Sequence, residues 1–115
     1  MTLKNKMLGK KGESLAYQHL KNKGYRLVGQ NIKFFCGEID LLMQDGDSLV
    51  IVEVKAKSDD SFGQAHDMIT NKKKKKLLQL AHTLNQKYPD KSIRIDVVAI
   101  DNEKIEHLVS AVEEE

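Results

Sequence analysis

The chain contains a single cysteine, Cys36, so it can form no internal disulfide bond. Such sparse cysteine usage is typical of proteins from a reducing compartment. No partner for a nucleophilic thiol lies near Cys36, and we expect a small, buried or half-buried side chain there. No apolar run approaches membrane-spanning length, and the lysine-rich start lacks a signal-peptide core. These absences lead us to expect a soluble, cytoplasmic protein.

The chain also has little excess charge of either sign. It has 19 Lys and Arg residues against 17 Asp and Glu residues, for a formal net charge of +2. A site for a polyanion must therefore come from where the charges lie and not from their total. The sequence contains no internal repeat or linker, and its 115 residues fit one domain spanning residues 1–115.

Two neighbouring apolar runs carry acidic residues that a purely structural strand has no reason to keep. The runs are Gly37–Met43 and Leu49–Lys55, and residues 45–48 between them have the sequence of a hairpin turn. Side chains alternate along a strand, so Glu53 and Lys55 project from the same face. Two opposite charges therefore leave that face of the sheet together.

The hairpin also fixes which residues of the two strands lie opposite one another. If Gln44 pairs with Leu49, Asp40 lies opposite Glu53, and a tighter turn makes the two acids diagonal neighbours instead. In both registers the carboxylates share one face at roughly 4.5–8 Å. Two like charges in such a place are unfavourable without a compensating cation. The sequence therefore predicts positive charge beside Asp40 and Glu53.

Two sources can supply that charge. Lys55 can form a structural ion pair with Glu53. Alternatively, Asp40, Glu53 and a backbone carbonyl can bind a divalent cation whose shell is completed by water, as Mg²⁺ prefers. A third acid, Glu13, falls on the inward stripe of the first predicted helix. It is either a first-turn acid favoured by the helix dipole or a functional carboxylate.

Apolar periodicity predicts two helices and five strands. The first helix begins near residues 9–12, after a basic lead-in, and stops at about Lys23, before Gly24. The second runs to about Tyr88 and is ended by Pro89, the only proline of the chain. The strands are expected at Tyr25–Ile32, Gly37–Met43, Leu49–Lys55, Ile93–Ile100 and Ile105–Val112. This order, αβββαββ, predicts an α/β fold with a mixed β-sheet flanked by helices.

Five consecutive lysines, Lys72–Lys76, precede the apolar stripe of the second helix. Extending that stripe back by four residues from Leu77 reaches Lys73, so Lys73, with Lys72, is expected to point toward the sheet. The run is either a solvated surface or a ridge that contacts phosphates. Phe34 and Phe35 are expected to be core or rim aromatics and not a base-stacking surface. Arg94 and Asp96 are expected to form a structural ion pair on one face of a strand.

Together these motifs resemble the YraN-type family of predicted endonucleases. The specific part is Gly-Glu-Ile-Asp-Leu at 37–41, followed about a dozen residues later by Glu-Val-Lys at 53–55. The match spans nearly the whole chain and includes Gly12-Glu13, Gly24-Tyr25, Asn31, Phe62-Gly63, Lys73 with Leu77 and Ala81, and Arg94-Ile95-Asp96-Val97-Val98. That family is similar to archaeal Holliday-junction resolvases and belongs to the PD-(D/E)xK nuclease superfamily. The resemblance therefore implies a restriction-endonuclease-like fold.

The resemblance also implies roles for individual residues. The family's core carboxylates, its catalytic lysine and its first-helix acid fall on Asp40, Glu53, Lys55 and Glu13. Its helix lysine falls on Lys73. The chain departs from the family at Lys57, where the family usually has arginine, and lysine contacts a phosphate through one point only.

From these residues we expect an Mg²⁺- or Mn²⁺-dependent endonuclease that cuts DNA, with branched or structured DNA as substrate. The metal would be bound by Asp40 and Glu53 with help from Glu13. The DNA backbone would be contacted by Lys57, Lys72, Lys73, Lys75 and Lys76. The resemblance implies a symmetric homodimer. The alternatives are a non-catalytic nucleic-acid-binding module with the same fold, and an adaptor whose acidic cluster is a closed ion-pair network.

Overall fold

The computed structural model describes residues 3–57, 69–101 and 104–113, and for residues 3–10 and 57 it describes the backbone alone. The elements follow the predicted order. They are α1 (Leu3–Asn22), β1 (Arg26–Phe34), β2 (Gly37–Asp45), β3 (Ser48–Lys57), α2 (Asn71–Lys87), β4 (Ser92–Asp101) and β5 (Lys104–Leu108). The predicted α/β architecture is thus confirmed, and it is compatible with a restriction-endonuclease-like fold.

The five strands form one mixed sheet in the order β1-β2-β3-β4-β5. β1, β2 and β3 pair antiparallel, as consecutive hairpins do. β3 and β4 pair in parallel, and α2 lies between them in the chain, because a parallel pair needs a crossover connection. β5 returns antiparallel along β4. The β2–β3 register includes Gln44 opposite Leu49, which confirms one of the two predicted hairpin registers.

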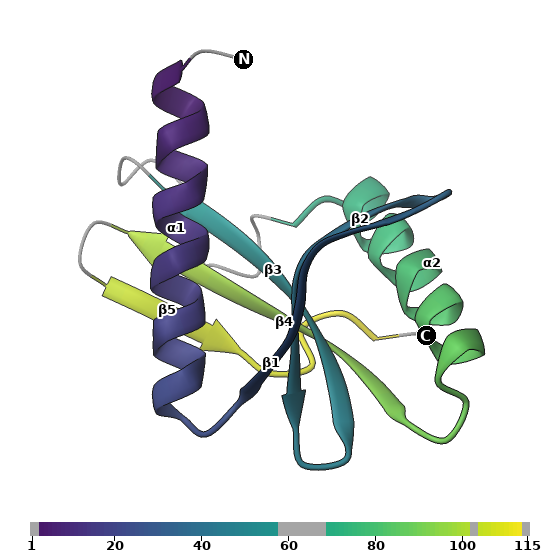
Figure 1. Ribbon diagram of the computed structural model, residues 1–115. Coiled ribbons are helices and arrows are strands. Elements are labelled where there is room, and N and C mark those ends of the chain that lie inside the picture. The colour runs from purple at the N-terminus through teal and green to yellow at the C-terminus, as the bar shows by residue number, and fades with distance from the viewer. Residues whose placement is uncertain (1–2, 58–68, 102–103, 114–115) are drawn as a thin grey trace.

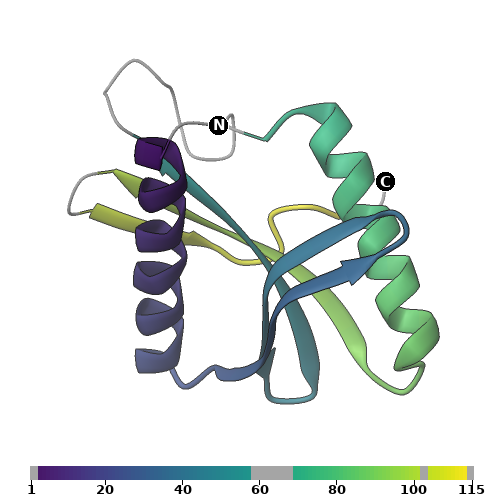
Figure 2. The same cartoon turned by 45° about the horizontal axis from the view of Figure 1, so that its top comes forward.

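The two helices cover opposite faces of the sheet (Figures 1 and 2). Leu49 and Ile51 of β3 belong to the apolar cluster that includes Leu77 of α2. Val50 and Val52, the alternate residues of β3, belong to the cluster that includes Ala16 and Leu20 of α1. β3 is therefore apolar on both faces because it is covered on both. The side chains of Glu53 and Lys55 project from β3 on the face covered by α2.

The helix ends differ from the prediction in two places. α1 begins at Leu3, so the segment expected to be a basic lead-in is helical. Its lysine, leucine and methionine residues are good helix formers, which outweighs the cost of the glycines. α2 begins at Asn71, and the Oγ of its N-cap residue, Thr70, accepts a hydrogen bond from the Lys73 backbone N–H at 3.1 Å. Leu77, Leu80 and Leu84 of α2 are buried, as its stripe predicted.

The last predicted strand is present but shorter than expected. β5 ends at Leu108, whereas the prediction ran to Val112. Ser110 has a φ of 51°, in the left-handed region, which turns the chain out of the strand. After the turn, the Ala111 N–H donates to the Ile95 carbonyl at 2.8 Å. Within the described residues no helix is long and apolar enough to cross a membrane.

The β1–β2 hairpin bends sharply at Asn31 and Asp40. The residues on either side of this position are paired, Gln30 with Leu41 and Ile32 with Ile39, and Asn31 has a φ of 53°. Asparagine is one of the few side chains that tolerate this left-handed conformation. Beyond the bend the hairpin curves over α2 (Figures 1 and 2). We call this distal part, residues 31–40, the hairpin arm.

On the α1 face, a buried ion pair lies at the core of a polar network. Asp96 is fully buried, with 0% of its surface exposed. Arg94 binds both of its oxygens, with Nε to Oδ1 at 2.9 Å and Nη2 to Oδ2 at 3.0 Å. The predicted ion pair between Arg94 and Asp96 on one strand face is confirmed. The Ser110 backbone N–H adds a bond to Oδ1 at 3.0 Å, so the carboxylate also fixes the turn after β5.

His107 completes the network from β5. Its Nε2 lies 2.7 Å from Asp96 Oδ2, and its Nδ1 lies 2.9 Å from the Lys23 ammonium. An ammonium can only donate, so Nδ1 accepts and Nε2 carries the hydrogen that is donated to Asp96. Burial alone would raise the pKa of Asp96, but the hydrogen bonds from Arg94, His107 and Ser110 outweigh it and hold that pKa below its ordinary value.

The bend at Asn31 predicts an unusual substitution pattern. Asn31→Gly should retain stability within about 1 kcal/mol, because glycine adopts a positive φ without strain. Asn31→Val should lose about 1–2 kcal/mol, because a β-branched side chain clashes in that conformation. Urea unfolding measures both. Lys33→Val, at an exposed position of the same strand, is the control and should change little; equal stability of the two Asn31 variants would contradict the account of the bend.

Asp96 predicts how stability responds to acid. The pKa of Asp96 is lower in the folded chain than in the unfolded chain. Its contribution to the free energy of unfolding is therefore fully present above the unfolded pKa of about 3.9 and is lost as the pH falls through the folded pKa. Asp96→Asn should cost about 3 kcal/mol or more at neutral pH and flatten the loss of stability below about pH 4. Asp45→Asn removes a partly exposed partner of the same guanidinium and should cost less than about 1 kcal/mol.

Unfolding free energies of the two variants from pH 2 to 7 provide this test. Equal losses in Asp96→Asn and Asp45→Asn would contradict it. If Asp96→Asn does not fold, a ¹³C titration of the Asp96 carboxyl in the unaltered chain decides, because the network requires a pKa below the ordinary one.

Candidate functional site

Glu53 lies on the α2 face of β3, where lysines from two elements reach it. Its side chain is 12% exposed. Lys55, two residues along the same strand, places Nζ 3.7 Å from Glu53 Oε1. Lys73, from the first turn of α2, places Nζ 3.6 Å from the same oxygen. The predicted ion pair between Glu53 and Lys55 is thus present, and α2 contributes a second cation to the same carboxylate.

Asp40 lies close enough to affect Glu53 electrostatically. Burial, together with repulsion from Asp40, raises the pKa of Glu53, while Lys73 and Lys55 lower it; the net pKa lies above the ordinary value. The β2–β3 ladder ends at the pair Leu41 and Val52, one step before Asp40 and Glu53. The acids therefore stand where the two strands part. Asp40 itself is exposed, so a ligand can reach it from solvent.

Glu13 approaches the same end of the sheet from the other face. It is partly buried on α1, and its neighbour Gly12 is fully covered. A Cβ on Gly12 would lie 3.6 Å from side chains of Val54 and Ala56, so this turn of α1 rests on the outer half of β3. Glu13 is therefore held beside the segment of β3 that follows Glu53. Its part in metal binding stays a prediction.

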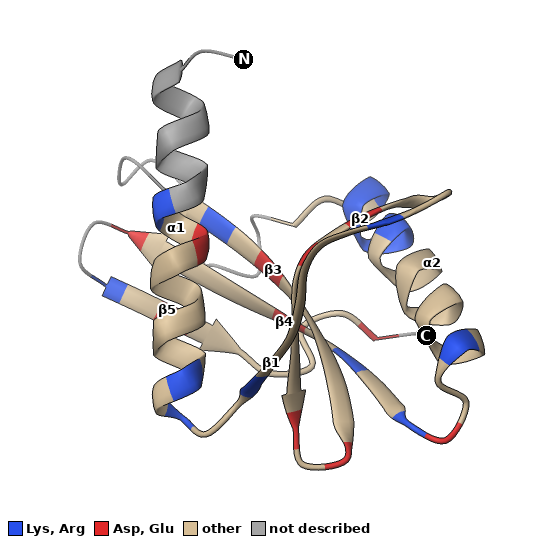
Figure 3. Cartoon of the chain, viewed as in Figure 1, with Lys and Arg blue, Asp and Glu red and all other residues tan. Residues whose placement is uncertain are grey.

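The lysines of α2 divide into an inner and an outer set. Lys73 points toward the sheet, as the stripe predicted, and Lys76 lies against the hairpin arm, its Cε 3.7 Å from where a Cβ on Gly37 would be. Lys72 and Lys75 are exposed, so the expectation that Lys72 faces the sheet is wrong. Figure 3 shows the basic residues gathered at the start of α2 beside the arm.

Two of the predicted functional positions lie beyond what the structure describes. The backbone of Lys57 ends β3 and pairs with Asp101, but its side chain is outside the described residues. The Phe62-Gly63 motif lies within residues 58–68, which are also outside them. The lysine contacts expected at Lys57 therefore stay a prediction.

The donor set at this site suits a hard divalent cation. Mg²⁺ is usually held by one or two carboxylates, with waters and substrate phosphates completing its shell. Asp40 and Glu53 supply two carboxylates that are close enough to interact electrostatically, and both are oxygen donors. Within residues 11–56, 69–101 and 104–113, no three His, Cys, Asp or Glu side chains form a group able to hold a metal ion. The residues therefore fit a metal shared with substrate, and not one enclosed by protein.

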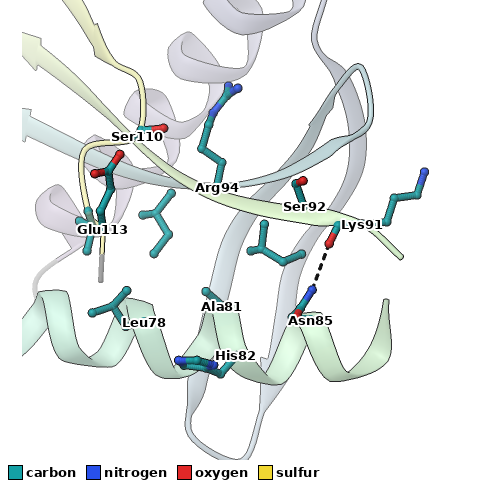
Figure 4. A pocket seen from close by; sticks show the side chains of 12 residues that line it. Leu78, Ala81, His82, Asn85, Lys91, Ser92, Arg94, Ser110 and Glu113 are labelled. Carbon is teal, nitrogen blue, oxygen red and sulfur yellow. Dashed lines mark hydrogen bonds between the residues drawn. The ribbon is translucent and has the colours of Figure 1, made fainter. Parts of the chain in front are cut away.

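A separate hollow lies between α2, the start of β4 and the chain after β5 (Figure 4). Its volume is about 390 Å³, and its walls include Leu78, Ala81 and Ile93. At one end, Asn85 Nδ2 donates to the Lys91 carbonyl at 3.0 Å. Neither Asp40 nor Glu53 lines it, so the converging charges and the hollow are different places.

Sequence reasoning missed the part that Asn31 plays. Its left-handed conformation bends the hairpin arm opposite Asp40, and so shapes the place where the strands part. A signal was present: an asparagine, tolerant of positive φ, interrupts a strand whose partner segment carries the acid. The expectation that Phe35 belongs to the core or its rim is wrong, because Phe35 is 96% exposed.

The α/β architecture with a mixed sheet and two helices is compatible with a restriction-endonuclease-like fold, and the chain also carries acids on adjacent strands and a Glu-x-Lys motif. Comparison with known proteins then places it more narrowly. The profile described as "Uncharacterised protein family UPF0102" matches residues 12–100. The chain belongs to this family, which is the YraN family that its motifs resemble.

Relatives in the family are similar over most of their length. The chain is 41% identical to a UPF0102 protein of Thermodesulfovibrio yellowstonii over 90% of this chain and 94% of that protein. It is 40% identical to one of Herminiimonas arsenicoxydans, over 93% and 87% of the two chains. A UPF0102 protein of Geobacter metallireducens is 35% identical over 98% of each. The relatives' names state no activity.

The site predicts that Mn²⁺ binds at Asp40 and Glu53. Calorimetric titration of the chain should show binding that Asp40→Ala and Glu53→Ala each weaken at least about 10-fold, equal to ~1.4 kcal/mol. Asp47→Ala, which removes an exposed acid of the β2–β3 turn, is the matched control and should bind as the unaltered chain does. Lys73→Met should strengthen Mn²⁺ binding, because Lys73 competes for Glu53. Equal binding by Asp40→Ala and Asp47→Ala would contradict the site.

Proposed function

We propose that this protein is a metal-dependent endonuclease that hydrolyses phosphodiester bonds in DNA, with branched or otherwise structured DNA as its substrate. One observation carries the proposal: Glu53 and Asp40 lie at the parting of β2 and β3, with two lysines against Glu53. An acid pair beside cations, open to solvent on one side, suits a substrate that brings its own negative charge and shares a metal.

In this proposal Asp40 and Glu53 hold Mg²⁺ or Mn²⁺, and Glu13 assists directly or through water. A metal held there would polarise the substrate phosphate and lower the pKa of a bound water. The protein supplies the position: Glu53 is fixed by its place on a strand covered on both faces, and Asp40 by the bend of the hairpin arm. A rigid support of this kind keeps reacting groups aligned.

Lys55 is the second group that acts on the reaction. Its ammonium already lies 3.7 Å from Glu53 and is partly exposed, so it can reach a phosphate placed between the acids and solvent. There it orients the attacking water or offsets the negative charge that builds up at phosphorus.

Lys73 links the acids to the DNA backbone. It pairs with Glu53 in the free protein, and a metal at Glu53 would remove the reason for that pair, leaving Lys73 to contact a phosphate. Lys57, Lys72, Lys75 and Lys76 would add further backbone contacts. Binding that depends on several lysines weakens steeply with salt. We propose a cytoplasmic location, as the sequence leads us to expect, and a homodimer, because symmetric cutting of a branched substrate would require two copies.

The second candidate is a nucleic-acid-binding module that keeps the fold and cuts nothing. The observation that favours it is the double ion pair at Glu53, which balances this carboxylate without a metal. Such a module would bind DNA in a salt-sensitive way that survives EDTA. Cleavage, and not binding, therefore separates the two candidates.

The deciding experiment is cleavage of four-way junction, flap and linear DNA in Mg²⁺ or Mn²⁺. The unaltered chain should cut at least one of these substrates, and EDTA should stop it. Asp40→Ala and Lys55→Ala should each slow cutting by at least about 100-fold, because each removes charge stabilisation at the reacting phosphate. Asp47→Ala should cut normally. The nuclease assignment fails if no substrate is cut, or if the Asp40 and Lys55 variants cut as fast as the unaltered chain.

A further inference from the structure

Phe35 is exposed to a degree that its neighbours are not. It forms the two-residue turn at the tip of the hairpin arm with Cys36, and 96% of its surface is accessible. The other exposed large apolar side chains of the described residues, Leu27, Val28 and Val109, are 44%, 43% and 55% exposed. Phe35 thus leaves nearly its whole ring in water, which a folding role does not explain.

The exposure does not come from a loose tip. Phe34 and Cys36, on either side of Phe35, pack against the apolar cluster that α2 shares with the sheet. Cys36 Sγ lies 3.6 Å from Thr83 Oγ1 of α2. Gly37 sits so close to Leu80 that a Cβ there would be 3.7 Å away. The arm is therefore fastened to α2 around Phe35, and the ring alone projects.

The helix against which the arm packs is lysine-rich at its start. The stem of Lys76 lies against Gly37, two residues from Phe35, and Lys72 and Lys75 are exposed on the same helix. On the arm itself Lys33 stands opposite Glu38, so those two charges offset one another. An accessible aromatic ring on an arm that packs against a lysine-bearing helix is a combination that can bind single-stranded nucleic acid, by stacking on bases and contacting phosphates.

The same charges argue against a second copy of the chain as the occupant. A two-fold contact centred on this patch would bring the lysines of both copies of α2 into one interface. Like charges brought together in this way oppose association. A polyanion, in contrast, complements the lysines and offers flat bases to the ring.

A short path connects the ring to the acids. Lys73 contacts Glu53, and Lys76, one helical turn further along α2, contacts Gly37 beside the tip. One turn of three residues advances ~4.5 Å. Adding the side chains and the turn places Phe35 on the order of 10–20 Å from Glu53. At ~3.4 Å per nucleotide along one strand, this corresponds to about three to six nucleotides.

We infer that Phe35 stacks on an unpaired base of the DNA, about three to six nucleotides from the phosphate at Asp40 and Glu53. The inference rests on the proposed function for its DNA partner, and it narrows the substrate to DNA with unpaired or unstacked nucleotides. Bases inside a duplex are already stacked on both faces and offer no surface to the ring. Phe35 is thus a positioning residue that selects a branch or gap near the cut.

The test uses flap DNA with 2-aminopurine at successive unpaired positions, in Ca²⁺ so that binding is seen without cutting. The chain should quench the fluorescence of the probe at one or two of these positions, and Phe35→Ala should abolish the quenching. Phe35→Ala should also weaken flap binding by about 5- to 150-fold, the effect of losing one stacked base. It should barely change binding to fully paired duplex, which depends on the lysines.

Two variants serve as controls. Phe35→Tyr keeps a stacking ring and should restore the quenching. Leu27→Ala removes a partly exposed apolar side chain from the same hairpin, on the other side of the bend, and should bind as the unaltered chain does. The inference is overturned if Phe35→Ala binds flap DNA normally, if duplex binding falls equally, if the chain binds no DNA, or if sedimentation shows that Phe35→Ala breaks up an oligomer.

The outcomes for stacking and for catalysis are separable. A chain that quenches the probe through Phe35 but cuts nothing keeps the stacking role and loses the nuclease assignment. A chain that cuts DNA while Phe35→Ala binds and quenches normally keeps the nuclease assignment and loses the stacking role.

Discussion

The structure depends on the two lysines that stabilise the charge of a largely buried carboxylate, that of Glu53. Glu53 is only 12% exposed on a strand covered by both helices, and burial and Asp40 oppose its ionisation. An isolated charge there would be unfavourable, so the carboxylate needs cations close to it. Lys55 comes from β3 and Lys73 from α2, which ties the crossover helix to the sheet. The ion pairs at Glu53 therefore both form the candidate site and hold α2 against the sheet.

The contacts around Glu53 are looser than those of a closed ion-pair network. The strands part at Asp40, the acid there is exposed, and Glu53 holds two lysines by contacts of 3.6 and 3.7 Å rather than by tight bidentate bonds. The buried network at Asp96 shows the contrast, since Arg94 grips it through two bonds of 2.9 and 3.0 Å. The Asp96 carboxylate is closed by its partners, whereas in the function we propose Glu53 would exchange its lysines for a metal.

The sequence predicted what depends on period and register. Alternation put Glu53 on the α2 face, the turn set Gln44 opposite Leu49, and the stripe of α2 turned Lys73 toward the sheet. The asparagine at position 31 was a signal for the bend, but the sequence alone could not establish it, because asparagine also occurs in ordinary strands and the packing of the arm selects the positive φ. For the same reason Phe35 read as an ordinary aromatic: only the packing of its neighbours on α2 leaves its ring outside.

The most direct measurement is a crystal structure of the chain grown with Mn²⁺. The anomalous scattering of Mn²⁺ locates the ion. An anomalous peak roughly 2 Å from carboxylate oxygens of both Asp40 and Glu53, with Lys73 Nζ drawn away from Glu53, is the predicted result. A peak elsewhere, or Lys73 and Lys55 still paired with Glu53 at saturating Mn²⁺, would contradict the metal site.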